Sequence, residues 1–304
     1  MVDQAVQQKV DQWLNGNIDD ESKQQIKELQ KDPKSLVDAF YKDLEFGTGG
    51  LRGIIGIGSN RINKYTVGKA TQGLANYLKQ SFAGSEIKVA IAHDSRNKSD
   101  YFARITAQVL AANGIHVYLF ESLRPTPELS FAIRELKCQS GVVITASHNP
   151  REYNGYKAYW EDGAQLVPPH DKNVMAQVNA IESFDQIKFE GNTDLIEMIW
   201  AEVDQKYLDR IETLIVNNEV IKQQNDLKIV YSSSHGTGIT MVPEILRRIG
   251  FTNVNIVEEQ AEPNGNFPTV VYPNPEEQEA MSLALDKARD IDADLIMATD
   301  PDTD

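Results

Sequence analysis

The sequence G-V-V-I-T-A-S-H-N-P at residues 141–150 is the stretch around which the rest of the chain can be arranged. Its run of β-branched apolar residues predicts a short buried strand, and the Ser-His-Asn-Pro sequence that follows favours a tight turn. We therefore expect Ser147 at the carboxyl end of a core strand, where open α/β sheets bind their ligands. Taken alone, the same pattern also fits an ordinary turn in which Ser147 bonds to backbone groups.

A βαβ pattern appears twice. Residues 87–96, I-K-V-A-I-A-H-D-S-R, predict a strand that ends in polar residues, and a helix and a second strand follow at about 99–113 and 115–120. The same order of strand, polar loop, helix, glycine and strand returns over residues 227–257. Such an internal repeat predicts an α/β fold with two similar domains. We place the first domain, with a helix-rich lead-in, at residues 1–205 and the second at residues 206–304.

Two cations are candidates for binding an anion near Ser147. The glycine-rich stretch at residues 46–58 allows close backbone approach or tight turns, and its Arg52 carries a forked charge suited to phosphate. The spacing does not match G-x-x-x-x-G-K-[ST], so a Walker nucleotide site is not supported. Lys157 is the second candidate, because we expect a turn containing Gly155 to bring it near the serine.

The acidic stretch at residues 293–304 predicts a metal site. A strand expected at residues 295–298 runs into Asp300, Asp302 and Asp304. Alternating carboxylates on a tight turn can face one point, and three hard oxygen donors suit Mg²⁺. A solvated acidic turn and the D-x-D nucleophile of a haloacid dehalogenase phosphatase are alternatives, whereas Pro301 argues against an EF-hand loop.

Two further segments have less definite predictions. Ser232, Ser233, Ser234, His235 and Gly236 have the composition of a binding loop, although a triple serine is often only a solvated turn. Residues 263–277 carry four prolines and predict an irregular, extended connection. Asp94 and Arg96 follow the strand at residues 87–93, where they can pair with each other or help to shape a phosphate site, and we expect pairing.

Composition limits the classes of partner. The 304 residues carry 30 basic against 45 acidic side chains, a net charge of −15 that repels nucleic acid and anionic lipid surfaces. We therefore expect neither nucleic acid nor a membrane as a partner. The single cysteine, Cys138, forms no intramolecular disulfide, and the first residues lack the apolar core of a signal peptide, so we expect a cytoplasmic location.

Six segments in this order resemble the α-D-phosphohexomutase superfamily, within it the phosphoglucomutase branch that includes phosphomannomutases and phosphopentomutases. They are F-G-T-G-G-L-R-G, T-A-S-H-N-P, N-G-Y-K, S-S-S-H-G-T-G, F-P-T-V-V-Y-P-N-P-E and D-P-D-T-D. The resemblance implies repeated three-layer α/β/α domains, here domain 1 plus an incomplete domain 2. It also implies an isomerase that moves a phosphoryl group between positions 1 and 6 of a hexose phosphate.

The resemblance also implies roles for individual residues. Ser147 is expected to be phosphorylated in the resting enzyme and to donate its phosphoryl group to the sugar, which then returns its other phosphoryl group. Lys157 matches an acid/base residue, Arg52 an arginine that assists beside the serine, and His148 a positioning residue. Asn149 is expected to position as well.

The implied metal ligands are the Ser147 phosphoserine oxygen, Asp300, Asp302 and Asp304. The implied cofactors are Mg²⁺ and an activating sugar bisphosphate of the glucose 1,6-bisphosphate type. Because members of the superfamily have four domains, we expect a truncated chain with little turnover of its own.

Three alternatives remain open: a phosphopentomutase of the same branch, a non-catalytic metal- or phosphosugar-binding fragment, and a metal-dependent phosphatase with Asp300 as nucleophile. A serine hydrolase is weaker, because G-x-S-x-G is absent around Ser147. The sequence predicts neither the preferred sugar nor the oligomeric state.

Overall fold

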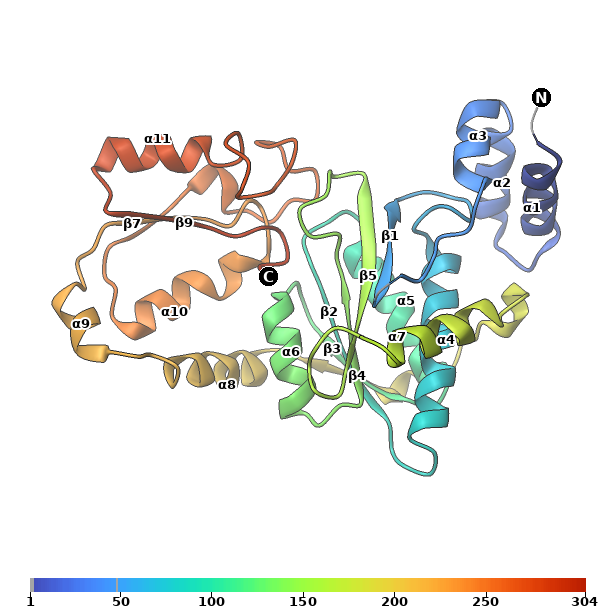
Figure 1. Ribbon diagram of the computed structural model, residues 1–304, viewed down its shortest axis with the longest axis horizontal. Helices are drawn as coiled ribbons and strands as arrows, with labels where there is room; N and C mark the ends of the chain where they lie inside the picture. The colour runs from blue at the N-terminus through green and yellow to red at the C-terminus, as the bar shows by residue number, and fades with distance from the viewer. Residues whose placement is uncertain (1–2, 48) are drawn as a thin grey trace.

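The computed structural model describes residues 3–47 and 49–304 (Figure 1). Thr48, which belongs to the glycine-rich stretch at residues 46–58, lies outside the described residues. Within these ranges the chain forms a helical lead-in, a larger α/β unit, here called the first unit, and a smaller α/β unit, the second unit. The two units lie side by side, and the C-terminal end of the chain lies between them (Figure 1).

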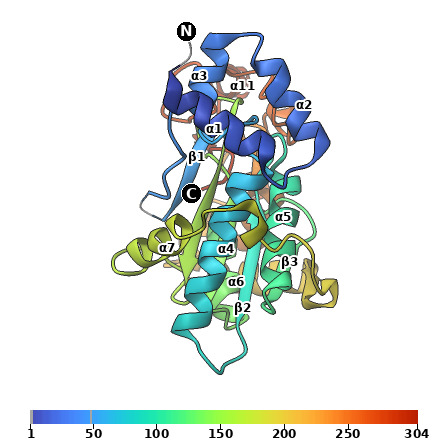
Figure 2. The same ribbon diagram turned by 90° about the vertical axis from the view of Figure 1, so that its right-hand side faces the viewer.

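Three short helices make up the lead-in. They are α1 (Gln4–Asn15), α2 (Asp20–Leu29) and α3 (Pro33–Phe40). Each begins after an aspartate whose carboxylate accepts a backbone N–H of the first turn, the usual way to satisfy a helix N-terminus. Their apolar faces form one cluster around Trp13 and Phe40, and Tyr65 of the first unit joins it. The lead-in therefore packs on the first unit, as Figure 2 shows.

The first unit is built on a mixed sheet of six strands within the described residues, in the order β1-β5-β4-β2-β3-β6. The strands are β1 (Gly50–Ile54), β2 (Lys88–His93), β3 (His116–Phe120), β4 (Ser140–Ile144), β5 (Tyr153–Trp160) and β6 (Ile196–Ile199). Strands β4, β2, β3 and β6 run parallel to one another, whereas β5 is antiparallel to both β1 and β4. The carboxyl end of β4 therefore lies next to the end of β2 and the start of β5.

Helices cover both faces of this sheet. One face packs against α4 (Lys64–Ser81), α5 (Ser99–Ala112) and α7 (His170–Asn179), and the other against α6 (Thr126–Glu135) and α8 (Ala201–Glu212). Alternating residues of β2 serve the two faces, since Val89 and Ile91 belong to one core cluster and Ala90 and Ala92 to the other. The result is the three-layer α/β/α arrangement that the sequence resemblance implied.

The second unit repeats the pattern on a smaller scale. Its sheet has the order β8-β7-β9, with all three described strands parallel: β7 (Ile229–Ser232), β8 (Val254–Ile256) and β9 (Leu295–Ala298). Helix α11 (Ser282–Ile291) covers one face, and α10 (Val242–Ile249) lies on the opposite side (Figure 1). Helix α8 contacts both α6 and α10, and α9 (Asn218–Gln223) follows it.

The predicted elements can now be compared with these strands and helices. The two βαβ repeats are confirmed as β2-α5-β3 and β7-α10-β8, each with parallel strands. Within the described residues, 263–277 contain no helix or strand, as expected. The division at residues 205 and 206 falls inside α8, and as a domain boundary it stays a prediction.

The expected turn at Gly155 is wrong, because Gly155 lies inside β5. A Cβ at this position would approach Thr145 O to 2.6 Å and Leu51 O to 2.7 Å, closer than side chains are tolerated. The glycine is required because two neighbouring backbone segments crowd this point of the strand, not because the chain turns there.

None of the helices in the part of the chain that the structure describes combines the length and apolar character needed to cross a membrane.

Candidate active site

Ser147 lies in the turn after β4, at the end of the sheet that faces the second unit. Its backbone has φ 52°, in the left-handed region that residues other than glycine seldom adopt, and its N–H donates to Thr145 Oγ1 at 2.9 Å. The Ser147 hydroxyl donates to Asp300 Oδ2 at 2.7 Å, and its oxygen lies 3.2 Å from His148 Nδ1. The serine is thus aimed at the acidic loop that follows β9.

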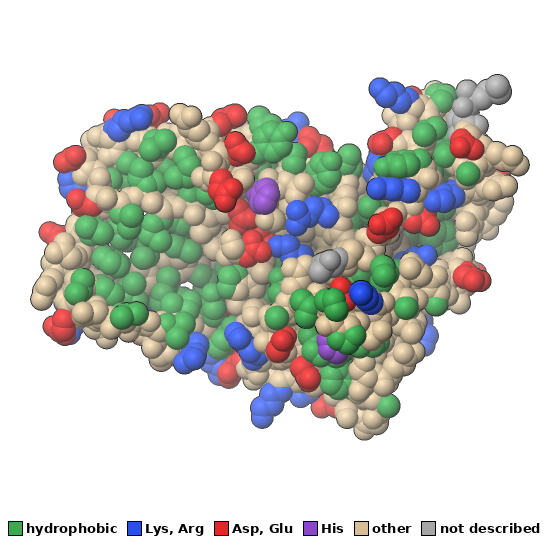
Figure 3. All heavy atoms as spheres, in the orientation of Figure 1, with side chains coloured by type: hydrophobic (Ala, Val, Ile, Leu, Met, Phe, Trp, Pro, Cys, Tyr) green, Lys and Arg blue, Asp and Glu red, His purple; other side chains and the backbone are tan. Residues whose placement is uncertain are grey.

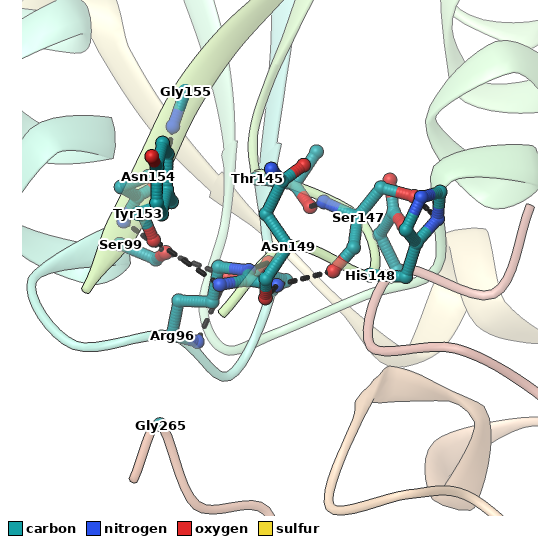
Figure 4. Close-up of polar contacts among 12 residues, drawn as sticks. Arg96, Ser99, Thr145, Ser147, His148, Asn149, Tyr153, Asn154, Gly155 and Gly265 are labelled. Carbon is teal, nitrogen blue, oxygen red and sulfur yellow. Dashed lines mark hydrogen bonds and ion pairs between the residues drawn. The ribbon is translucent and has the colours of Figure 1, made fainter. Parts of the chain in front are cut away.

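The carbonyl groups of this turn converge on one buried arginine, Arg96, in the loop after β2 (Figure 4). Its guanidinium donates to Ser147 O, Asn149 O (2.5 Å), Pro150 O (2.9 Å) and Tyr153 O (3.1 Å). Because an arginine fork holds several acceptors in fixed directions, Arg96 defines the path of the turn.

Sequence reasoning missed the contacts between Arg96 and the serine turn. The expected pairing of Arg96 with Asp94 is confirmed, since Nε lies 3.3 Å from Asp94 Oδ2 and both side chains are fully buried. The carbonyl contacts come from residues 51 to 57 positions away, so no local pattern contained them. The signal that could have indicated these contacts is the position of a polar residue at the end of β2, the strand next to β4.

Arg52 and Lys157 reach the turn from two other strands. Arg52 is exposed on β1, and its Nη1 donates to Asn149 Oδ1 at 2.8 Å. Lys157 lies on β5, where its Nζ is 2.8 Å from Asp302 Oδ2 and 2.8 Å from Asp304 Oδ2. Both candidate cations are therefore part of the cluster. Arg52 contacts the serine turn, whereas Lys157 contacts the acidic loop.

The acidic loop brings its carboxylates together. Oxygens of Asp300, Asp302 and Asp304 all lie within 4.8 Å of one another. Asp300 and Asp302 are buried, whereas Asp304 is exposed. Thr126 at the start of α6 holds the middle residue, since its hydroxyl donates to Asp302 Oδ2 at 3.0 Å and its N–H donates to Asp302 O at 2.8 Å.

Burial and neighbouring charges shift the protonation of this cluster. Burial, together with the charge of Asp302, raises the pKa of Asp300 to about 8. Burial would also raise the pKa of Asp302, but the charge and hydrogen bond of Lys157 outweigh it and leave that pKa below its ordinary value. Burial likewise opposes the charge of Lys157, yet Asp302 and Asp304 hold its pKa above the ordinary range.

The donor set fits a hard divalent cation such as Mg²⁺. Three carboxylates and the Ser147 hydroxyl supply only oxygen ligands, which Mg²⁺ prefers. Asp302 Oδ1 is buried, and it has no hydrogen-bond partner among the described residues. A cation near it would satisfy this oxygen and relieve the repulsion from Asp302 that adds to the effect of burial on the pKa of Asp300.

The loop after β7 supports the acidic loop from behind. Ser233 Oγ donates to Gln260 O at 2.9 Å, and the Thr237 N–H donates to Pro301 O at 2.9 Å. A Cβ on Gly236 would overlap the backbone of Pro301. The serines and His235 are almost fully buried, which excludes the alternative of a solvated turn. The loop packs against residues 300–304, and its interpretation as a binding loop stays a prediction.

On the face shown in Figure 3, acidic side chains, a histidine and basic side chains gather where the two units meet. The predicted site residues come from four separate segments, and the structure connects all of them. Their contacts run from Arg52 through Asn149 to the serine turn, and from Ser147 and Lys157 to the acidic loop.

Two models of one protein family match most of the chain. The sequence model described as phosphoglucomutase/phosphomannomutase, alpha/beta/alpha domain I, matches residues 43–185, and the model for domain II of the same family matches residues 205–304. The chain belongs to the phosphoglucomutase/phosphomannomutase family. This confirms the resemblance to the phosphohexomutase superfamily, and the two matched ranges contain every residue of the cluster.

Individual proteins of this family are also similar to the chain in sequence. The phosphoglucomutase of Staphylococcus haemolyticus is 42% identical over 87% of this chain and 48% of its own length. A probable phosphoribomutase of Schizosaccharomyces pombe is 36% identical over the whole chain and 53% of its own length. The chain thus spans about half the length of the curated relatives it matches.

A solved structure of the same family has the same fold. The putative phosphomannomutase of Thermus thermophilus superimposes with a TM-score of 0.74 at 26% identity. The match covers 86% of this chain and 56% of that structure.

Proposed function

We propose that this chain carries the phosphoserine and metal-binding part of an enzyme of the phosphoglucomutase/phosphomannomutase type. The observation that carries the proposal is the 2.7 Å hydrogen bond from Ser147 Oγ to Asp300 Oδ2, which joins a strand-end serine of the first unit to the acidic loop of the second. Membership of the family supports the reaction type, an intramolecular phosphoryl transfer.

In the proposed reaction Ser147 is the phosphoryl carrier. A hydroxyl of a hexose phosphate attacks the phosphorus of phosphoserine, a new P–O bond forms to the sugar, and the bond to Ser147 Oγ breaks with its electron pair left on the serine. The bisphosphorylated sugar turns around and returns its other phosphoryl group to the same oxygen. The net change is a phosphoryl group moved between positions 1 and 6.

The other residues of the cluster have proposed roles in binding and proton transfer. Arg52 supplies a forked cation for phosphoryl oxygens, and His148 orients the serine hydroxyl that lies 3.2 Å from its Nδ1. Lys157 holds the proton that is exchanged with the sugar hydroxyl.

We propose Asp300, Asp302, Asp304 and Ser147 as ligands of Mg²⁺. When bound there, the ion would neutralise charge on the transferred phosphoryl group. The position of the carboxylates next to the serine hydroxyl supports this assignment.

The test is intact-mass analysis and peptide mapping of the purified chain before and after exposure to glucose 1,6-bisphosphate with Mg²⁺. We expect one added phosphoryl group on the peptide that contains Ser147, and none in Ser147→Ala. An unmodified Ser147 would contradict the proposal for this chain. Phosphate release that survives Ser147→Ala and disappears in Asp300→Asn would favour the metal-dependent phosphatase instead.

A pentose phosphate is a second candidate substrate, because the relative that matches the whole chain is named a probable phosphoribomutase. The same labelling experiment with ribose 1,5-bisphosphate separates the two sugars. Faster labelling by the pentose compound would favour the phosphopentomutase assignment. The cytoplasmic location, the absence of nucleic acid and membrane partners, and weak turnover by the chain alone stay predictions.

A further inference from the structure

Hydrogen bonds within the Ser147 turn are only part of what holds it. Its serine has a positive φ, a conformation that costs free energy and persists only when surrounding groups impose it. The surrounding group is Arg96, which is 3% exposed and donates to four carbonyl oxygens between Ser147 and Tyr153. Hydrogen bonds from a charged donor are roughly twice as strong as those between neutral groups, so Arg96 is the main restraint on the turn.

Arg96 is in turn covered by the second unit. The guanidinium carbon lies 5.1 Å from the centre of the Phe267 ring, within the range of a cation–π interaction. Phe267 is 2% exposed and belongs to the irregular segment at residues 263–277. The ring therefore closes over the arginine from a residue 171 positions along the chain.

The same segment fits closely against the backbone beside Arg96. Asn97 Nδ2 donates to Asn266 Oδ1 at 2.9 Å. A Cβ on Gly265 would overlap the backbone N of Asn97, so only glycine allows the approach seen here (Figure 4 shows Gly265 below Arg96). Backbone packing and the Phe267 ring thus dock one edge of the second unit on the loop that carries Arg96.

We propose that Arg96 is a positioning residue for Ser147 and that the second unit sets the shape of the serine turn through Phe267. Docking of the segment holds the guanidinium in place, the guanidinium holds the carbonyls, and the carbonyls fix the direction of the Ser147 hydroxyl. The consequence for phosphoryl transfer rests on the proposed function above, whereas the consequence for the turn itself does not.

The first test measures hydrogen exchange of the backbone amides of Ser147, Asn149 and Tyr153, which are hydrogen-bonded within the turn. Phe267→Leu keeps an apolar side chain but removes the ring face. We expect protection of these amides to fall by about 3-fold to 30-fold, the equilibrium equivalent of one cation–π interaction. Arg96→Lys, which keeps the charge but loses the fork, should lower protection further.

Val270→Ala is the matched control. Val270 shares a small apolar cluster with Phe267 and Ala280, so this variant loosens the same cluster and leaves the ring over Arg96. Protection of the turn should stay within about 2-fold of wild type in this control. An unchanged turn in Phe267→Leu, or an equal loss in Val270→Ala, would overturn the inference.

A second readout follows Ser147 phosphorylation by glucose 1,6-bisphosphate with Mg²⁺. We expect Phe267→Leu to lower the maximal labelling rate and to leave the half-saturating donor concentration unchanged, because the turn and not the sugar contacts is altered. A raised half-saturating concentration at an unchanged maximal rate would overturn the positioning role. If wild-type protein takes up no phosphoryl group, the proposed function fails, and the exchange experiment still decides the inference.

Discussion

The turn after β4 and the turn after β7 begin alike. Each follows a core strand of a parallel βαβ pattern, and each contains a Ser-His pair with the serine in the left-handed region, Ser147 at φ 52° and Ser234 at φ 48°. Beyond this the turns differ in what their side chains contact. The first directs a hydroxyl to Asp300 across the junction between units, whereas the second directs its polar groups into its own unit.

The two histidines show the difference most clearly. His148 is exposed and presents Nδ1 to the Ser147 hydroxyl. His235 is buried, and its two ring nitrogens lie within hydrogen-bond distance of Glu262 O and Thr269 Oγ1. A Ser-His pair at a strand end therefore does not by itself indicate chemistry. What distinguishes the two turns is whether hydrogen-bonding capacity remains for a partner outside the unit.

The largest expected difference concerns the two serines. Ser147→Ala should lower phosphoryl transfer by roughly four orders of magnitude or more, because the covalent carrier is lost. Ser234→Ala should leave transfer within about 10-fold of wild type, since this residue only supports the loop. The check is the rate of label incorporation from a bisphosphorylated sugar, with circular dichroism to verify folding. Equal losses in the two variants would mean that the two serines do not differ in their role.

The next largest effect concerns the acidic loop, which both turns contact. Mg²⁺ at about 100 times its dissociation constant should stabilise the wild-type chain by about 2.7 kcal/mol, and EDTA should reverse this. Asp302→Asn should remove most of the gain, because it neutralises the most buried carboxylate of the cluster. Asp290→Asn, at an exposed position of α11, is the control and should keep the full stabilisation by Mg²⁺. Thermal unfolding with and without the metal decides; full stabilisation of Asp302→Asn would exclude this site.

A smaller effect is expected from the support that the second turn gives. Gly236→Ala places a methyl group against the backbone of Pro301 and should displace the acidic loop, so Mg²⁺ affinity should fall by about 10- to 100-fold. In Gly47→Ala the new Cβ meets its nearest neighbour at 3.9 Å, and affinity should not change. Calorimetric titration compares the two variants. An unaffected Gly236→Ala would show that the second turn is not a support.

The smallest expected effects concern the free energy of unfolding after replacement of each histidine. His235→Ala removes a buried ring together with its hydrogen bonds to Glu262 O and Thr269 Oγ1, and should lower the free energy of unfolding by about 1–2 kcal/mol. His148→Ala removes an exposed ring and should change stability by no more than about 0.5 kcal/mol while slowing label transfer. Urea unfolding measures both. A reversed order of stability would mean that the exposed histidine is the structural one.

Local patterns in the sequence were enough to predict the strands, the helices and part of the site. Apolar runs located β2, β7 and β9, because a strand buried on both faces is apolar along its length, and helical spacing located α5, because burial of one helix face imposes a helical period. The strand-end position of Ser147 and the convergence of three alternating aspartates follow from the same local geometry. Resemblance of short motifs then indicated the family that the comparisons show.

The pairing of distant polar groups depends on the assembled fold. Lys157 meets Asp302 across 145 residues, and Arg96 meets Phe267 across the junction between the units. Gly155 was predicted to lie in a turn, where glycine is common because it allows a positive φ. In the structure glycine is needed for a different reason, since neighbouring backbone leaves no space for a side chain, and the sequence alone does not distinguish the two reasons. A solvated turn was an open alternative for the serines after β7, because burial of a hydroxyl depends on partners such as Gln260, which come from another segment of the chain. Hydrogen bonds and close packing act over a few ångströms in space, and which residues come that close is fixed only when the sheets and their connecting segments are assembled.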